Sequence, residues 1–296
     1  PYEPDALYRC PGEGSYVVGL AASDGARRLA ASVALPADAA VEILDAELRR
    51  LRSLAAPHGA AAATGLAFLS GTDEELVSCG EDGAVRLWDF RAPGGAQQSL
   101  RPAGGAPALS VAVGADGTTA ACAVESAVHL LDIRAGRERF VHEEAHSENV
   151  TCLRFRPGIP HELVTAGDDG LVCVLDLRKC GAPPTDDDDD DAGLRLVVQN
   201  GESVKSLAFA GADAGVACAT SMTDALQFWC IHERRPGAPC GSFPDLRSDP
   251  CLRVEDSDGY LVDVFFSDRS GRVKVIAGAV DGRLGIFEVN LQASHF

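Results

Sequence analysis

Two stretches of the sequence decide the fold: LVSCGEDGAVRLWD at residues 76–89 and LVTAGDDGLVCVLD at residues 163–176. Each begins with apolar and β-branched residues, turns at Asp-Gly, and continues as an alternating apolar and polar segment that ends in an acid. Alternation on both sides of an Asp-Gly pair is typical of a β-hairpin. The sequence therefore predicts the same hairpin twice in one chain.

Weaker copies of this hairpin recur along the chain. The last strands of all copies end near residues 45, 89, 132, 176, 230 and 288, at intervals of 44, 43, 44, 54 and 58 residues. Another candidate strand precedes each hairpin, and helical patterning is confined to residues 40–54, where a strand fits better. A period of about 40 to 45 residues with short strands is typical of a propeller blade. We predict an all-β fold, a β-propeller with six recognisable blades and a single domain over residues 1–296.

The charge balance favours basic partners. The 296 residues include 26 Lys and Arg against 44 Asp and Glu, for a net charge of −18. Six of the acids form one run at residues 186–191, inside an insertion at 184–193 that we expect to be a solvated loop, with contact to a basic partner as the alternative. Such a surface repels phosphate backbones, so we expect no direct nucleic-acid binding.

Cysteine and hydropathy patterns indicate the compartment. None of the ten cysteines has C-x-x-C spacing, and several lie in apolar segments, which favours reduced thiols and no zinc ribbon. The sequence shows neither a signal peptide nor an apolar run long enough to span a membrane. We expect an intracellular protein, cytoplasmic or nuclear, with no cofactor and no membrane partner.

The blade that ends at residue 89 resembles the repeats of the WD-repeat family. In that family a His, a Ser or Thr, an Asp and a Trp form a buried hydrogen-bonded tetrad, because polar groups enclosed between strands need partners. The resemblance assigns these structural roles to His58, Ser78, Asp82 and Trp88.

Two other blades depart from the family pattern. The fourth supplies His146, Thr165 and Asp169 but has Leu175 in the Trp position, so we expect a shorter network there. The third has Ser-Ala where Asp-Gly would lie, and we expect no network. The family usually has seven blades, so we expect a fragment of a seven-bladed ring that lacks its C-terminal part, with a true six-bladed ring as the alternative.

The ends of three hairpins carry candidate partner-binding residues. Asp89 is followed by Arg91, and the corresponding positions in the next two blades hold Arg134 and Arg178. In WD-repeat proteins a W-D-x-R ending resembles the docking motif of substrate receptors for cullin-4 RING ubiquitin ligases, and only the first ending matches completely. An Asp–Arg pair that closes a blade corner is the structural alternative.

The segment His142-Glu143-Glu144-Ala145-His146 matches H-E-x-x-H, the zinc-binding motif of metallohydrolases. That chemistry requires a helix, so that both imidazoles share one face. Here the segment lies between two blades, and we expect no metal or catalytic site.

These observations predict a non-catalytic scaffold for protein–protein interactions, with basic proteins or peptides as partners. The alternatives are a substrate receptor that contacts a cullin-4 ligase adaptor through Arg91 and, remotely, a zinc hydrolase that uses His142 and His146.

Overall fold

The computed structural model describes residues 14–92, 95–143, 145–180, 193–211, 213–246, 259–267, 272–279 and 284–289. The chain divides into two compact units, residues 1–144 and 145–296. Except for Gly193, the acidic insertion expected at 184–193 lies outside the described residues.

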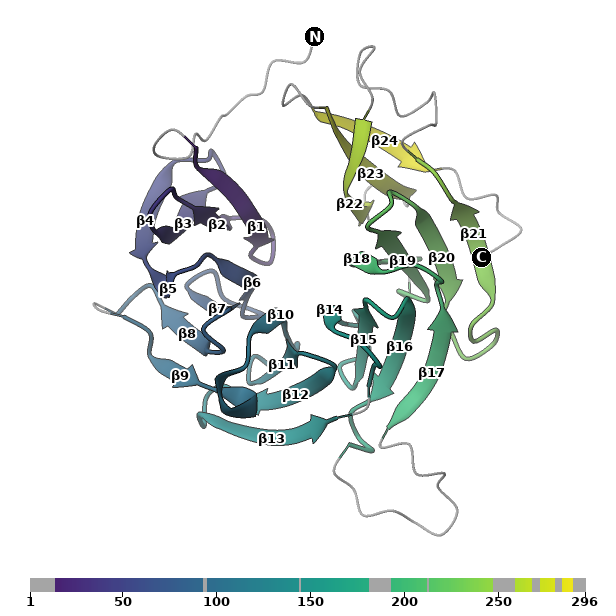
Figure 1. The fold of residues 1–296 in the computed structure, drawn as a ribbon, viewed down its shortest axis with the longest axis horizontal. Helices are drawn as coiled ribbons and strands as arrows, with labels where there is room; N and C mark the ends of the chain where they lie inside the picture. Colours follow the sequence, from purple (N-terminus) through teal and green to yellow (C-terminus); the bar gives the residue numbers. More distant parts are fainter. Residues whose placement is uncertain are drawn as a thin grey trace. The chain divides into compact units, whose positions relative to one another are not determined.

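The first unit contains three blades, each an antiparallel sheet of four strands in sequence order (Figure 1). The strands of these blades are β1 (Tyr16–Ala22), β2 (Arg28–Ala34), β3 (Ala39–Asp45) and β4 (Arg50–Ala55) in blade 1; β6 (Ala63–Phe68), β7 (Glu75–Gly80), β8 (Val85–Asp89) and β9 (Gln98–Leu100) in blade 2; and β10 (Ala108–Val113), β11 (Thr119–Val124), β12 (Ala127–Asp132) and β13 (Arg137–His142) in blade 3. The connections between blades contain a short strand, β5 (Pro57–Ala60), and a 3₁₀ turn, η1 (Pro102–Gly105).

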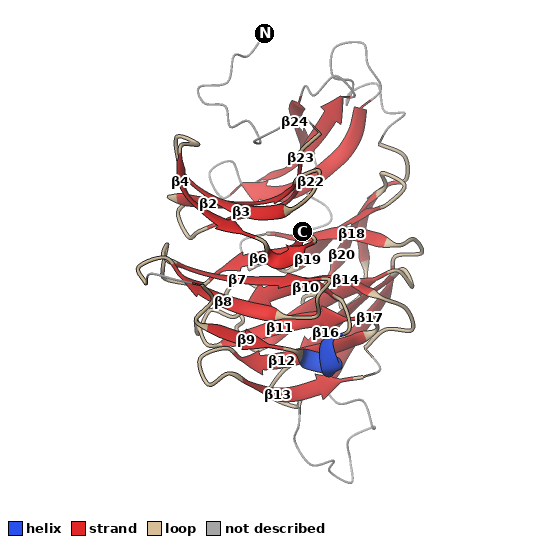
Figure 2. Ribbon diagram, turned by 60° about the vertical axis from the view of Figure 1, so that its left-hand side comes forward, coloured by secondary structure: helices blue, strands red, loops and turns tan. Residues whose placement is uncertain are grey.

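The second unit continues with two blades of four strands and one blade with three described strands. Its strands are β14 (Val150–Phe155), β15 (Glu162–Gly167), β16 (Leu171–Asp176) and β17 (Leu194–Gln199) in blade 4; β18 (Val204–Ala210), β19 (Val216–Ser221), β20 (Leu226–Cys230) and β21 (Pro239–Phe243) in blade 5; and β22 (Gly259–Ser267), β23 (Arg272–Ala279) and β24 (Leu284–Val289) in blade 6. Figure 2 shows that η1 is the only helical segment among the described residues.

The all-β prediction is confirmed: six successive sheets are the blades of a β-propeller. The segment 40–54, for which a helix was the competing interpretation, forms β3 and β4 joined by a tight turn. β21, which begins at Pro239, is an edge strand of its sheet, where a residue without an amide hydrogen is tolerated.

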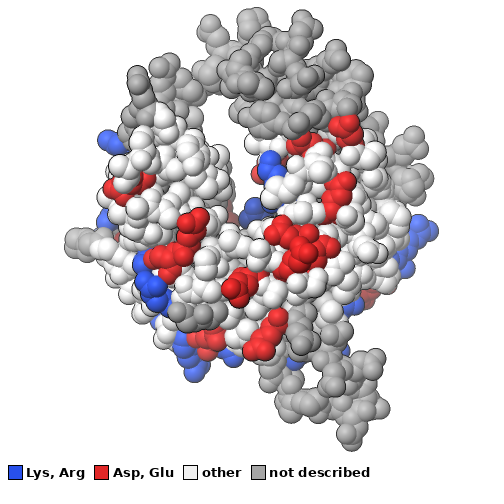
Figure 3. All heavy atoms as spheres, in the orientation of Figure 1, with Lys and Arg blue, Asp and Glu red and all other residues white. Residues whose placement is uncertain are grey.

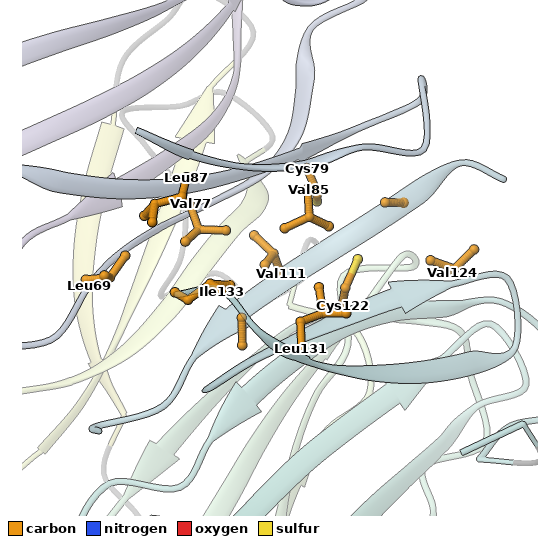
Figure 4. Close-up of a cluster of buried hydrophobic side chains, with 12 residues drawn as sticks. Leu69, Val77, Cys79, Val85, Leu87, Val111, Cys122, Val124, Leu131 and Ile133 are labelled. Carbon is orange, nitrogen blue, oxygen red and sulfur yellow. The ribbon is translucent and has the colours of Figure 1, made fainter. Parts of the chain in front are cut away.

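Apolar side chains on facing strands form the cores between neighbouring blades. Figure 4 shows one such cluster between blades 2 and 3, where Val77 and Cys79 of one sheet meet Val111, Cys122 and Leu131 of the other. All five are almost completely buried. Burial of a side chain of this size stabilises a fold by about 1.5–3 kcal/mol, so the interfaces between blades hold each unit together.

The antiparallel order gives every blade two distinct ends. The turn between the second and third strands and the connection to the next blade lie at one end, here called the network end. The turns that follow the first and third strands lie at the other, here called the exit end.

Candidate functional site

Blade 2 contains a continuous chain of buried hydrogen bonds at its network end. Trp88 on β8 donates its Nε1–H to Ser78 Oγ on β7 at 2.9 Å. Ser78 Oγ lies 2.7 Å from His58 Nε2, and His58 Nδ1 lies 2.7 Å from Asp82 Oδ1 in the Asp-Gly turn. The structure thus brings together the four residues assigned to the structural tetrad.

The chemistry of the end groups sets one direction for this chain. An indole N–H can only donate and an ionised carboxylate can only accept, so Ser78 donates to His58 and His58 donates to Asp82. Burial lowers the pKa of His58, and the hydrogen bond and charge of Asp82 oppose that shift only in part. The imidazole is therefore neutral at pH 7 and serves as a fixed link between strands.

The sequence pattern missed one member of this network. Arg86, on β8, pairs with Asp82 Oδ2 at 2.8 Å. The network also requires Gly80, because a Cβ there would lie 2.5 Å from the imidazole of His58. The ring therefore fits only against a residue with no side chain.

Blade 4 has a shorter version of the network. His146 Nε2 lies 2.9 Å from Thr165 Oγ1, and His146 Nδ1 lies 3.0 Å from Asp169 Oδ1. The carboxylate of Asp169 also accepts backbone N–H groups from Ser147 and Leu171. Because Leu175 takes the place of Trp, the chain of hydrogen bonds in this blade ends at Thr165.

Two other blades pair buried polar side chains in different ways. In blade 3, His129 Nδ1 lies 2.8 Å from Glu138 Oε2. In blade 5, Trp229 donates its indole N–H to Asn200 Oδ1 at 3.0 Å, and Gln227 donates to the Asn200 carbonyl oxygen. Asn200 is 4% exposed and comes from the preceding connection, so it takes the place that a strand hydroxyl has in blade 2.

The H-E-x-x-H segment lacks the geometry that a zinc hydrolase needs. His142 is the last residue of β13, and the described residues that follow it are not helical. Both ring nitrogens of His146 are already bonded, to Thr165 and Asp169. Among the described residues, no group of three or more His, Cys, Asp or Glu side chains is arranged to hold a metal ion.

Two of the three predicted arginines form tight pairs at the exit end. Arg91 donates Nε and Nη2 to the two carboxylate oxygens of Asp89 at 2.9 and 2.8 Å, and its backbone N–H also donates to Asp89. Arg178 repeats the arrangement with Asp176 at 2.9 and 2.6 Å. The pairing forms across the turn after the strand, because β8 and β16 end at the acids.

These pairs keep the acids charged but leave the arginines exposed. The hydrogen bonds from Arg91 lower the pKa of Asp89 to about 2. The side chains of Arg91 and Arg178 nevertheless remain 63% and 66% exposed. A partner can therefore reach both guanidinium groups without breaking the blade.

Arg134 departs from the expected pairing. It donates Nη1 and Nη2 to the two carboxylate oxygens of Glu75, at 2.6 and 2.7 Å, in a bidentate bridge from blade 3 to blade 2. Asp132, its expected partner, accepts instead from Arg139 at 2.7 Å. Glu75 is opposite Asp89 in the sheet, and Arg134 offsets the repulsion between these two carboxylates.

Acidic side chains gather at the network end of blades 4 and 5, and this group is here called the acidic edge. Its members are Glu148, Asp168, Asp169, Glu202 and Asp224. No Lys or Arg occurs in the loops that carry them, residues 145–149, 168–170, 200–203 and 222–225, all of which are described. Figure 3 shows groups of Asp and Glu side chains among uncharged residues on the face in view.

The members of the acidic edge differ in accessibility. Asp224 is buried and accepts the backbone N–H of Leu261 at 3.0 Å, so it is structural. Glu148 and Glu202 are exposed. A hydrogen bond from Thr223 lowers the pKa of Glu202, which keeps this carboxylate negative at neutral pH.

The eight described cysteines are all free thiols, and burial raises the pKa of Cys152 to about 12. No helix among the described residues has the length and apolar character needed to cross a membrane.

The repeats match a known family. The model of the WD domain, G-beta repeat, matches residues 50–89 and 138–176, which include the first three strands of blade 2 and the first three strands of blade 4. The chain is also 25% identical over 222 residues to the WD repeat-containing protein 89 homolog of Dictyostelium discoideum. The chain therefore contains WD repeats and is similar to WD-repeat proteins.

Other relatives support the same family. The WD-repeat chain is 28% identical over 219 residues to the WD repeat-containing protein GTS1 of Arabidopsis thaliana, and 30% identical over 115 residues to the ribosome biogenesis protein YTM1 of Laccaria bicolor. The three alignments cover 75%, 73% and 38% of this chain, and 57%, 52% and 25% of the respective relatives. The chain thus spans little more than half the length of the first two.

A solved structure agrees on the fold of this chain. A chain in the crystal structure of the mitotic checkpoint complex superposes with a TM-score of 0.71 at 20% sequence identity, and the match covers 94% of this chain and 76% of that one.

Proposed function

We propose that this protein is a non-catalytic scaffold whose acidic edge binds basic segments of other proteins. The observation that carries the proposal is the composition of the network-end loops of blades 4 and 5, which hold five carboxylates and no Lys or Arg. Complementary charge accelerates encounter and selects against partners of like charge. One relative is named a ribosome biogenesis protein, and ribosomal proteins are a basic class that this edge suits.

A peptide titration tests the acidic edge directly. A fluorescein-labelled octalysine peptide is titrated with the protein, and anisotropy is read at two salt concentrations. We expect Glu148→Gln/Glu202→Gln to weaken binding about three- to tenfold, as for two partly screened charges. The matched control, Asp213→Asn/Glu233→Gln, removes two charges from the exit end of blade 5. Equal weakening by both pairs would show that only net charge matters.

Affinity capture from cell extract, followed by mass spectrometry, then identifies the partner. Recovery of basic ribosomal or assembly proteins that the Glu148→Gln/Glu202→Gln variant fails to capture supports the scaffold. Capture that does not depend on these two side chains contradicts it.

The accessibility of Arg91 favours a second candidate, a substrate receptor of a cullin-4 ubiquitin ligase. Its guanidinium group is held by Asp89 in one orientation and remains 63% exposed. Under this hypothesis Arg91→Ala abolishes pull-down of the ligase adaptor. Arg49→Ala is the matched control, because Arg49 is also held by an Asp, Asp45, but follows a strand that lacks the Trp. Retention of the adaptor by Arg91→Ala contradicts the receptor function.

A further inference from the structure

The fourth strand of each four-stranded blade is an outer strand that pairs on one side only. An unpaired strand edge is a template for another chain, and folded proteins protect such edges with charge, proline or short length. Four of these five outer strands carry one of the three devices. β4 has Arg50 and Arg52, β13 begins with Arg-Glu-Arg at 137–139, β21 begins at Pro239, and β9 has three residues.

β17 has the least protection of the five outer strands. It lies at the outer side of the blade 4 sheet (Figure 1), and its sequence over Leu194–Gln199 is LRLVVQ, with one charged side chain. That side chain, Arg195, is held against blade 5. Its Nη2 donates to the carbonyl oxygen of Ile231 at 2.8 Å, and its Nε lies 3.1 Å from Glu162 Oε1. No charge therefore guards the edge, and Val197 is 46% exposed.

The free edge of β17 presents backbone hydrogen-bonding groups. At the end of the ladder between β16 and β17, Asn200 N–H donates to the Gly170 carbonyl oxygen at 2.8 Å. Hydrogen bonding alternates along an antiparallel pair, so Val198 directs its N–H and C=O to β16, and Val197 and Gln199 direct theirs outward. No other segment that the structure describes bonds to these outer groups.

The opposite side of β17 is firmly packed. Leu196 and Val198 contribute to the hydrophobic core shared by blades 4 and 5. Glu162, which holds Arg195, is 5% exposed and also accepts from Arg156 at 2.7 Å. A strand that is already fixed loses little conformational entropy when a second strand pairs with it.

We propose that the free edge of β17 binds an extended segment of a partner protein by strand addition. The backbone groups of Val197 and Gln199 supply hydrogen bonds, and the exposed Val197 side chain favours an apolar neighbour. The segment is neutral or basic, because six aspartates at 186–191 precede β17 in the sequence and Glu202 follows it. The net charge of −18 opposes a second copy of this chain as the occupant.

Two fluorescein-labelled peptides test strand addition, with fluorescence anisotropy of the unchanged chain as the readout. KTVTVTK forms an extended strand readily, whereas KTPTPTK has the same charge but lacks two of the amide hydrogens that a ladder uses. We expect saturable binding of KTVTVTK and about tenfold weaker binding of KTPTPTK. Hydrogen exchange of the KTVTVTK complex, measured by mass spectrometry, should show protection of residues 194–199.

A proline substitution in the chain tests the same edge from the other side. Val197→Pro removes an outward N–H without breaking a bond to β16, and we expect it to weaken KTVTVTK binding about tenfold. The matched control is Val141→Pro, at the equivalent position of β13, which should bind as the unchanged chain does. Circular dichroism first establishes that both variants are folded, and the two peptides decide the question on the unchanged chain if either is not.

Four results overturn the proposal. They are equal binding of the two peptides, exchange protection confined to segments other than β17, equal weakening by both proline variants, and a dimer in sedimentation velocity that Val197→Pro dissociates. The acidic edge is separated by Glu148→Gln/Glu202→Gln, in which the difference between the two peptides should persist. Loss of octalysine binding in that variant bears only on the acidic edge.

Discussion

Ser78 is the central link of the blade 2 network, and its removal gives the sharpest test of that network. The hydroxyl is completely buried and contacts both Trp88 Nε1, at 2.9 Å, and His58 Nε2, at 2.7 Å. Ser78→Ala leaves an indole N–H and an imidazole nitrogen unsatisfied, at about 1–3 kcal/mol each. We expect the free energy of unfolding to fall by about 2–4 kcal/mol.

The control is another buried serine with a single hydrogen bond. Ser32 is equally inaccessible and donates to the carbonyl oxygen of Ala63 at 2.7 Å, so Ser32→Ala should cost about 1 kcal/mol. Urea unfolding followed by circular dichroism measures both values without relying on tryptophan fluorescence.

A double-mutant cycle isolates the contact itself. In Trp88→Phe the indole donor is already absent, so a subsequent Ser78→Ala leaves only His58 unsatisfied. We expect a coupling free energy of about 1 kcal/mol between Ser78 and Trp88. Additive effects, or a cost for Ser78→Ala no larger than that for Ser32→Ala, would refute the assignment of a cooperative network.

Three further predictions follow from the same contacts. Asp82→Ala should destabilise the chain by about 1 kcal/mol more than Asp168→Ala in urea unfolding, because only the former strips a buried imidazole of its partner. The pKa of His58 is lowered from 6.5 in the folded chain, so below pH 6.5 the unfolded chain binds more protons than the folded one. The free energy of unfolding should therefore fall as the pH drops below 6.5. His58→Asn should remove this component from the pH dependence of the unfolding midpoint. Arg156→Ala should cost about 1–3 kcal/mol, because it removes the donor 2.7 Å from Glu162 Oε2 and leaves only Arg195 paired with this buried carboxylate. Arg178→Ala should cost less than about 1 kcal/mol, because its pair with Asp176 is exposed, and equal thermal shifts for the two variants would contradict this difference.

Local pattern was enough to predict the blades. In blades 2 and 4 the Asp-Gly turn and the alternation around it fix the hairpin within a few residues, because the pairing partners are neighbours in sequence. The resemblance to the WD-repeat family predicted the roles of four residues, and the structure joins their side chains by hydrogen bonds: His58, Ser78, Asp82 and Trp88.

Contacts between blades could not be predicted in the same way. Arg134 and Glu75 are 59 residues apart, and their bridge depends on how blade 3 packs on blade 2. Trp229 and Asn200 are 29 residues apart, and no repeat position marks the amide as a substitute for a hydroxyl. Such contacts depend on how one sheet packs against the next. The sequence pattern of a single blade does not contain this information.

Each sheet is made of strands that are consecutive in the chain, and this has a consequence for biosynthesis. All ladder hydrogen bonds of blade 2 form between residues 63 and 100, so every residue of this sheet is synthesised before the strands of blade 3. Contacts of short sequence separation form quickly, and domains commonly fold in the order of their synthesis. A nascent blade nevertheless exposes the apolar face that its successor will cover. The order of synthesis is therefore also the order in which these faces are hidden from chaperones and from other chains.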